Sequence, residues 1–93
     1  MKKAEKALFV AISRSDSNGV HDALLRGVDP DAADHLGRTA LMIAARLDDV
    51  ESMKMLLFYK CNPDQKDYIR RSAYMYAIKY KANKAQRLLL GED

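Results

Sequence analysis

The residues of this chain repeat at an interval of 33 positions, and the repeat needs no gap. The interval relates Ala11 to Ala44 and Ala77, Asp34 to Asp67, Arg38 to Arg71, Leu24 to Leu57, Leu56 to Leu89, and Pro30 to Pro63. A fixed period in this range is typical of solenoids, in which each unit buries its apolar face only against its neighbours. The period therefore predicts a single domain, 1–93, made of three units: 1–33, 34–66 and 67–93.

Within each unit, apolar residues recur at the three- and four-residue spacing of a helix with one buried face. The spacing predicts six helices: 2–14, a second helix that ends at Gly27, 40–47, 49–59, 73–80 and 82–90. The residues expected to face inward are Ala4, Leu8, Ala11 and Ile12, then Val20, Ala23 and Leu24, then Leu41, Ala44 and Ala45, then Met53, Leu56 and Leu57, and finally Tyr74, Ala77 and Ile78.

Polar residues and glycines mark the ends of these helices. Thr39 and Ser72 precede predicted helices, where a hydroxyl can accept a backbone hydrogen bond as an N-cap. Gly27 and Gly91 follow predicted helices, where glycine readily adopts the left-handed conformation. Aspartates recur in the connecting turns, and we expect them to accept hydrogen bonds from the local backbone. They are Asp29, Asp31, Asp34, Asp64 and Asp67.

Side chains that could support catalysis or bind a metal are sparse. His21 and His35 have no second histidine or cysteine at ligand spacing, whereas a zinc site needs three or four such ligands. Cys61 is the single cysteine, so no intrachain disulfide can form, and a reducing compartment suits the chain. There is no glycine-rich phosphate loop. We therefore expect a protein that is not an enzyme and that has no catalytic residues, cofactor or metal.

The N-terminus has lysines followed by an apolar run, which is the general order of a signal peptide. That run, 7–12, is short, Glu5 precedes it, and Arg14 follows it without a cleavage-site pattern. No apolar segment approaches the ~20 residues that a membrane-spanning helix needs. We expect a cytoplasmic protein with neither a signal peptide nor a transmembrane segment.

The repeating residues resemble the ankyrin repeat, whose 33-residue unit is a hairpin turn, two antiparallel helices and a loop. Residues that fall on that family's pattern are Leu8, Ala11, Leu24, Gly27 and Asp29 in the first unit, Asp34, Gly37, Thr39, Leu41, Ala44, Ala45, Leu56 and Leu57 in the second, and Asp67, Ala77, Leu88, Leu89 and Leu90 in the third. The resemblance covers almost the whole chain. It implies an all-α ankyrin-repeat solenoid of three antiparallel helix pairs joined by short hairpin turns.

The chain departs from the family pattern at several positions. Met42 and Met75 stand where the family has histidine, and Lys60 and Arg70 stand where it has glycine. Gln86 occupies the position of Val20 and Met53, and a polar residue there suits the outer face of a terminal unit. We therefore interpret 1–33 as an N-terminal capping repeat, 34–66 as the central repeat and 67–93 as a truncated C-terminal capping repeat. A fragment of a longer array is the alternative.

Beside its core residues, the first helix of each unit carries a second row of side chains, which are Val10, Ser13 and Arg14, then Ile43, Arg46 and Leu47, then Tyr76, Lys79 and Tyr80. In ankyrin repeats this row and the hairpin tips line a concave groove for partners. The resemblance thus implies partner-binding roles for His35, Leu36, Arg38, Ile43, Arg46, Leu47, Tyr68, Ile69, Arg71, Tyr76, Lys79 and Tyr80. Tyrosine and arginine are also enriched at interaction hot spots. In the alternative interpretation, Tyr76 and Tyr80 merely cover the helix pair.

The excess positive charge lies in the third unit, because 67–93 contains six Lys or Arg and three Asp or Glu, whereas each of the other units is balanced. We predict a non-catalytic module that binds a protein or peptide, with an acidic or amphipathic segment as its target. Exposed Arg71 and Lys79 are expected to attract that partner. Two alternatives are nucleic-acid binding through the basic third unit and a structural role in which a monomer associates end to end. We expect no membrane partner.

Overall fold

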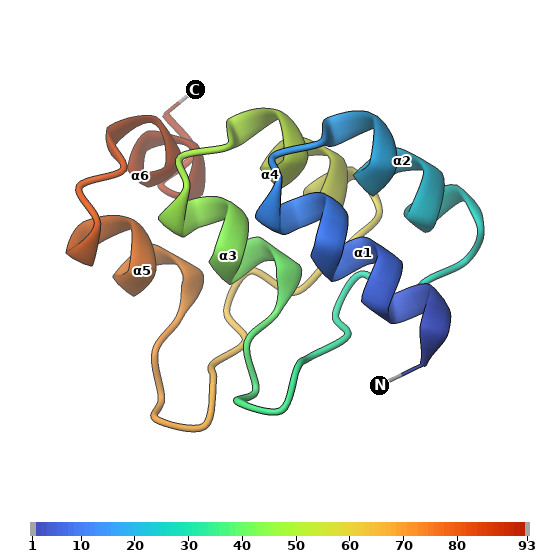
Figure 1. The fold of residues 1–93 in the computed structure, drawn as a ribbon. Helices are drawn as coiled ribbons and strands as arrows, with labels where there is room; N and C mark the ends of the chain where they lie inside the picture. The colour runs from blue at the N-terminus through green and yellow to red at the C-terminus, as the bar shows by residue number, and fades with distance from the viewer. Residues whose placement is uncertain (1, 93) are drawn as a thin grey trace.

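The computed structural model describes residues 2–92, which form six helices. They are α1 (Lys3–Ser13), α2 (Ser17–Leu25), α3 (Ala40–Arg46), α4 (Val50–Phe58), α5 (Ala73–Lys79) and α6 (Asn83–Leu89), as Figure 1 shows. The only β-type pairing among the described residues is an isolated bridge between Ala33 and Thr39. The predicted all-α architecture and the six predicted helices are confirmed. No described helix has the length and apolar character needed to cross a lipid bilayer.

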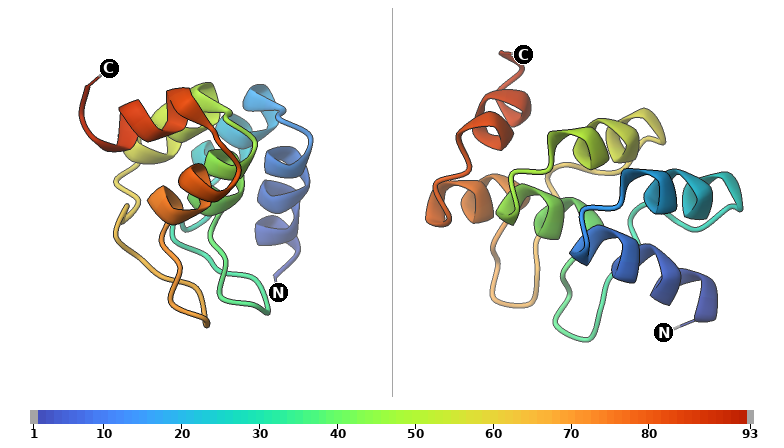
Figure 2. Two further views of the ribbon diagram at one scale, coloured as in Figure 1. Left: turned by 90° about the vertical axis from the view of Figure 1, so that its left-hand side faces the viewer. Right: turned by 45° about the horizontal axis from the view of Figure 1, so that its top comes forward.

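The helices form two layers, with α1, α3 and α5 in one and α2, α4 and α6 in the other (Figures 1 and 2). Neighbouring pairs contact each other through α1 and α3, α3 and α5, α2 and α4, and α4 and α6. Two hairpin loops, at 34–38 and 67–71, extend away from the helices on the side of the α1, α3 and α5 layer (Figure 2). Each pair therefore buries its apolar faces mainly against the next pair along the chain.

Large apolar side chains fill the space between the two layers, while alanines lie where helices approach each other. The side chains that are almost fully buried are Leu8, Ile12, Val20, Leu41, Met42, Met53 and Leu56. Ala40, Ala44, Ala45, Ala77 and Ala85 have no exposed surface. Since a core at this packing density tolerates little added volume, the alanines fix how closely the pairs can stack.

Side-chain caps begin four of the helices. Asp16, Thr39, Asp49 and Ser72 each accept a hydrogen bond from the backbone N–H three residues later. The predicted caps at Thr39 and Ser72 are thereby confirmed. At Thr39 the bonding is reciprocal, because its own N–H donates to Met42 Sδ at 3.4 Å. Met42 occupies the position where the family pattern has histidine, so a thioether takes over one hydrogen bond at this turn.

Several connections require a left-handed backbone. Gly27 and Gly91 have φ of +92° and +77°, which confirms them as the residues that end α2 and α6. Lys60 and Arg70 adopt φ of 68° and 69°, although neither is glycine. The turns have therefore kept their conformation while losing the residue that adopts it most easily.

Four residues predicted to face inward are not buried, and one of them, Leu57, is half-buried. Ala4 is exposed, Tyr74 is half-buried, and Ile78 is 49% exposed. The positions equivalent to Ile78, which are Ile12 and Ala45, are buried because a following helix pair covers them. Ile78 has no such neighbour within residues 2–92. On the same side, Gln86 turns its amide inward and donates from Nε2 to the Ala77 carbonyl at 3.2 Å.

Candidate functional site

The two hairpin tips contact each other and expose apolar side chains. The Tyr68 backbone N–H donates to the Leu36 carbonyl at 3.2 Å. The Tyr68 ring also lies so close over Gly37 that a Cβ there would be 2.5 Å from a ring carbon. Even so, Tyr68 is 74% exposed and Ile69 is 67% exposed. We call the exposed tip residues His35, Leu36, Tyr68 and Ile69 the tip patch.

A buried carboxylate holds the second hairpin in shape. Asp67 accepts hydrogen bonds from the backbone N–H groups of Ile69 at 3.1 Å and Arg71 at 2.8 Å. It also accepts from Arg71 Nε at 3.1 Å and from the Tyr76 hydroxyl at 2.6 Å. Burial alone would raise the pKa of Asp67, but these hydrogen bonds outweigh it and lower the pKa to about 2. Asp67 is therefore an ionised structural anchor.

This network engages two residues of the predicted binding set. Tyr76 is only 4% exposed, so it does not present its ring to a partner. The Arg71 guanidinium is ion-paired with Asp67, lies 4.7 Å from the Tyr76 ring centroid, and donates to the Tyr76 hydroxyl at 3.0 Å. Arg71, which was expected to be exposed, is thus only partly exposed and is already paired with a carboxylate. The cause is tertiary, since Tyr76 reaches the carboxylate of a residue nine positions earlier.

The equivalent residues of the middle unit are also partly withdrawn from the surface. Arg38 Nε pairs with Asp34 at 2.9 Å, and Asp34 accepts the backbone N–H groups of Leu36 and Arg38 at 2.9 Å each. Ile43, which was predicted to line the groove, is buried beneath the surface of α3. Asp34 and Arg38 therefore stabilise the first hairpin, and Ile43 is part of the core. The aspartates Asp34 and Asp67 accept local backbone hydrogen bonds, as the sequence predicted.

A second exposed group lies at the C-terminal ends of α3 and α5. Leu47 and Tyr80 follow these helices and are 40% and 47% exposed. Arg46 and Lys79 direct their charged groups to the Tyr80 ring, each 5.8 Å from its centroid. We call Arg46, Leu47, Lys79 and Tyr80 the helix-end patch. Eight of the twelve predicted binding residues are therefore gathered in two patches, one at each end of α3 and α5, and Arg38, Ile43, Arg71 and Tyr76 lie outside them.

Sequence reasoning missed an aromatic group on the other layer. Phe58 is 78% exposed, and its ring contacts that of Tyr59 edge to face, with the centroids 5.5 Å apart. The Tyr59 ring is also 6.2 Å from that of His21. Together with Met55 they border a hollow of about 270 Å³ between α2 and α4. The 33-residue period could have indicated this group, because it places a large apolar residue, Leu25, at the position equivalent to Phe58. Both side chains are exposed.

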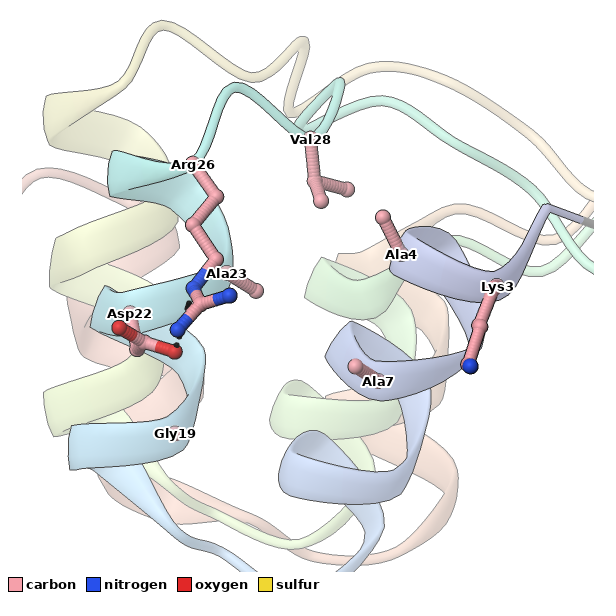
Figure 3. Close-up of a pocket in the computed structure, with 8 residues that line it drawn as sticks. All are labelled: Lys3, Ala4, Ala7, Gly19, Asp22, Ala23, Arg26 and Val28. Atoms are coloured by element: carbon pink, nitrogen blue, oxygen red, sulfur yellow. Dashed lines mark ion pairs between the residues drawn. The ribbon is translucent and has the colours of Figure 1, made fainter.

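A larger groove lies between α1 and α2, as Figure 3 shows. It measures about 500 Å³ and is lined by Lys3, Ala4, Ala7, Gly19, Asp22, Ala23, Arg26 and Val28. Arg26 Nε pairs with Asp22 at 3.0 Å, and both of these side chains are well exposed. Since small apolar side chains line most of this groove, it presents no cluster of groups that could perform chemistry.

The single thiol is poorly suited to react. Cys61 is buried, and burial, followed by the negative charge of Asp31, raises its pKa to about 12. A thiol with that pKa is protonated at neutral pH and is a weak nucleophile.

Among the described residues, no three His, Cys, Asp or Glu side chains lie together where they could hold a metal ion. The exposed side chains of the tip patch and the helix-end patch are suited to contact another molecule.

A family model described as ankyrin repeats matches residues 4–93, in three copies. No curated protein gives a significant match to the chain.

Proposed function

The chain belongs to the ankyrin repeat family, and we propose that it binds another protein through the face that carries the tip patch and the helix-end patch. Ankyrin repeats are generally non-catalytic modules for protein–protein interaction. Which of its faces this chain uses, and for what partner, is our inference from the exposed residues. In this proposal the two patches are parts of one concave surface formed by the hairpins and the α1, α3 and α5 layer.

The exposure of the tip patch is the observation that carries the proposal. Tyr68 and Ile69 place two large apolar side chains in solvent at the end of a hairpin. Burying such side chains against a partner releases about 25 cal/mol per Å² of apolar surface. The hairpin that presents them is held by five hydrogen bonds among Asp67, Ile69, Arg71 and Tyr76. Because the tip is already ordered, its binding loses less conformational entropy than that of a flexible loop.

The charge of the third unit indicates what the partner carries. The six basic and three acidic residues of 67–93 favour an acidic or amphipathic protein segment. Lys79 is exposed on this face, and Arg46 is partly exposed. Opposite charge steers the encounter, while the apolar tips supply buried area.

Affinity purification with two matched variants tests the proposal. The full chain and its Tyr68→Ala/Ile69→Ala variant would each be used as bait, and retained proteins would be compared by mass spectrometry. Phe58→Ala, on the other helix layer, is the control because it also removes an exposed aromatic side chain. We expect the specific partner to be retained by the wild type and the control and lost from the tip variant. Loss from Phe58→Ala alone would place the binding surface on the α2 and α4 side.

Nucleic-acid binding is a second candidate that the positive charge of the third unit favours. Binding dominated by phosphate contacts weakens steeply as salt rises, whatever the nucleotide sequence. Retention of a labelled oligonucleotide at physiological salt, with a strong salt dependence, would favour this candidate over a protein partner.

End-to-end association of copies is a third candidate. Met75, Ile78 and Leu90 are exposed, although the equivalent residues of the middle pair are largely buried. Sedimentation over a concentration series tests this candidate directly. A mass that rises with concentration and is restored to that of a monomer by Ile78→Glu would support it.

A further inference from the structure

We propose that Arg46, Lys79 and Tyr80 form a binding site for a carboxylate side chain of the partner, with Leu47 contacting the apolar residue beside that carboxylate. This inference rests on the proposed protein-binding function and specifies the chemistry that the partner must offer. It commits to an acidic peptide segment, an Asp or Glu next to an apolar residue, as the occupant of the helix-end patch.

The geometry brings two positive charges to one exposed ring. Arg46 and Lys79 are 33 positions apart, so they occupy the same place in the last turn of α3 and of α5. The Arg46 guanidinium carbon and Lys79 Nζ each lie 5.8 Å from the Tyr80 ring centroid. The ring attracts both cations through its negative face. Two long side chains from different helix pairs thereby contact the same exposed ring.

No carboxylate of the described chain neutralises these cations. Ion pairs join Asp22 to Arg26, Asp34 to Arg38 and Asp67 to Arg71, and within residues 2–92 no carboxylate pairs with Arg46 or Lys79. The acidic residues nearest in sequence hold backbone groups instead. Asp48 Oδ1 accepts the Ala85 N–H at 2.8 Å, and Asp49 accepts both the N–H and the hydroxyl of Ser52. Two positive charges therefore remain available to an anion from outside.

The surroundings of the cations favour a peptide over a phosphate backbone. Leu47 and the Tyr80 ring place exposed apolar surface directly beside the charges, and a side chain next to the partner's carboxylate can cover that surface. A nucleic acid would need cations that follow a phosphate backbone. Two of the other cations of the third unit, Lys84 and Arg87, belong to α6 in the opposite helix layer.

A library of random peptides displayed on phage, selected against the full chain, provides the probe. Binding of the selected peptides is then measured on two variants that lose the same charge. Arg46→Gln/Lys79→Gln removes the cations of the site, and Lys84→Gln/Arg87→Gln removes two exposed cations of α6. We expect the selected peptides to share an Asp or Glu beside an apolar residue. Their affinity should fall about tenfold, equivalent to about 1.4 kcal/mol, on the first variant only.

The other outcomes separate this inference from the general proposal. If the peptides lack an acid and lose affinity on Tyr68→Ala/Ile69→Ala but not on Arg46→Gln/Lys79→Gln, the carboxylate site is wrong while binding at this face stands. If they lose affinity only on Phe58→Ala, both proposals are wrong. Equal losses on the two charge variants would indicate non-specific attraction and overturn the site. An oligonucleotide that competes with the peptides and responds strongly to Arg46→Gln/Lys79→Gln would reassign it to nucleic acid.

Discussion

At the scale of single residues, a buried carboxylate determines which part of the predicted site is available. Asp67 accepts hydrogen bonds from the Tyr76 hydroxyl and from Arg71 Nε, so these two side chains stabilise the hairpin. A hydrogen bond to a charged group contributes about 1.5–3 kcal/mol, more than one between neutral groups. The same chemistry that withdraws Tyr76 and Arg71 from the surface keeps Tyr68 and Ile69 in a fixed position.

The Tyr76 hydroxyl should therefore matter for stability. Tyr76→Phe removes the 2.6 Å hydrogen bond to Asp67 while keeping the ring. We expect the free energy of unfolding to fall by about 1.5–3 kcal/mol in urea melts at neutral pH. Tyr74→Phe is the control, because Tyr74 is half-buried and its hydroxyl makes no hydrogen bond among the described residues. An equal loss from both variants would mean that the ring environment, and not this bond, is responsible.

The same variant should respond to acid in a defined direction. The pKa of Asp67 is lowered from 3.8 to about 2 in the folded chain. Its contribution to stability is thus fully present above its unfolded pKa and is lost as pH falls through its folded pKa. The difference in unfolding free energy between wild type and Tyr76→Phe should shrink between about pH 4 and pH 2. A difference that is constant over that range would indicate that Asp67 is not the partner that matters.

Lys60 offers a test of backbone strain. It has φ of 68°, a conformation that costs residues other than glycine roughly 1 kcal/mol or more. Lys60→Gly should leave stability unchanged or raise it by roughly 0.5–1 kcal/mol, because greater freedom of the unfolded chain offsets part of the relief. Lys54→Gly, within α4, should instead destabilise by about 1 kcal/mol. Chemical denaturation of both variants makes the comparison, and destabilisation by Lys60→Gly would show that the lysine side chain itself stabilises the turn.

At the scale of helices, the close contact between α3 and α5 depends on alanines. Ala44 and Ala77 are fully buried, so a larger side chain would force the pairs apart. Helical spacing, repeated after 33 residues, was sufficient to predict these two positions, because Ala44 and Ala77 recur at the same place in their units. It was not sufficient in α5, where Ala73–Ile78 is a continuous apolar run. Spacing within that run cannot show that Tyr76 faces inward and Ile78 outward, since the deciding contacts come from Asp67 and from the neighbouring pair.

Ala44→Leu tests the packing of these helices. Overpacking of a dense core costs about 1–3 kcal/mol, and each kcal/mol lowers the melting temperature by about 4–8 °C in a domain of this size. We expect the thermal midpoint followed by circular dichroism to fall by several degrees. Ala4→Leu makes the same change at an exposed position of α1 and should leave the midpoint nearly unchanged. An unaltered midpoint for Ala44→Leu would contradict the close contact of α3 and α5.

At the scale of the whole molecule, hydrogen bonds between successive pairs link the stack. The Asn62 N–H donates to Asp31 Oδ1 at 2.7 Å, between the first and second units. The Ala85 N–H donates to Asp48 Oδ1 at 2.8 Å, between the second and third. The period predicted the stack, but these bonds join residues that are 31 and 37 positions apart, so they depend on how the units pack and not on the repeat itself. The separation of the site into two patches was unpredictable for the same reason.

Stability should be unequal along this stack. Ala85 is the one residue of α6 that is buried, whereas six of the seven residues of α3 are buried. Since local opening is easiest where few apolar contacts must be broken, backbone amides of α6 should exchange with deuterium much faster than those of α3. Amide exchange followed by NMR measures both helices in one sample. Equal protection would show that the whole stack opens only as a single cooperative unit.

The ring of Tyr68 against Gly37 has a consequence for how mutational scans of this protein are interpreted. Any side chain at Gly37 would collide with that ring and displace it. Gly37 itself is buried and would touch no partner. If the tip patch binds the partner as proposed, a scan that replaces each residue in turn would therefore score Gly37 as a binding determinant. Its effect would be indirect, because the substitution would move the Tyr68 ring of the tip patch without removing any contact between Gly37 and the partner.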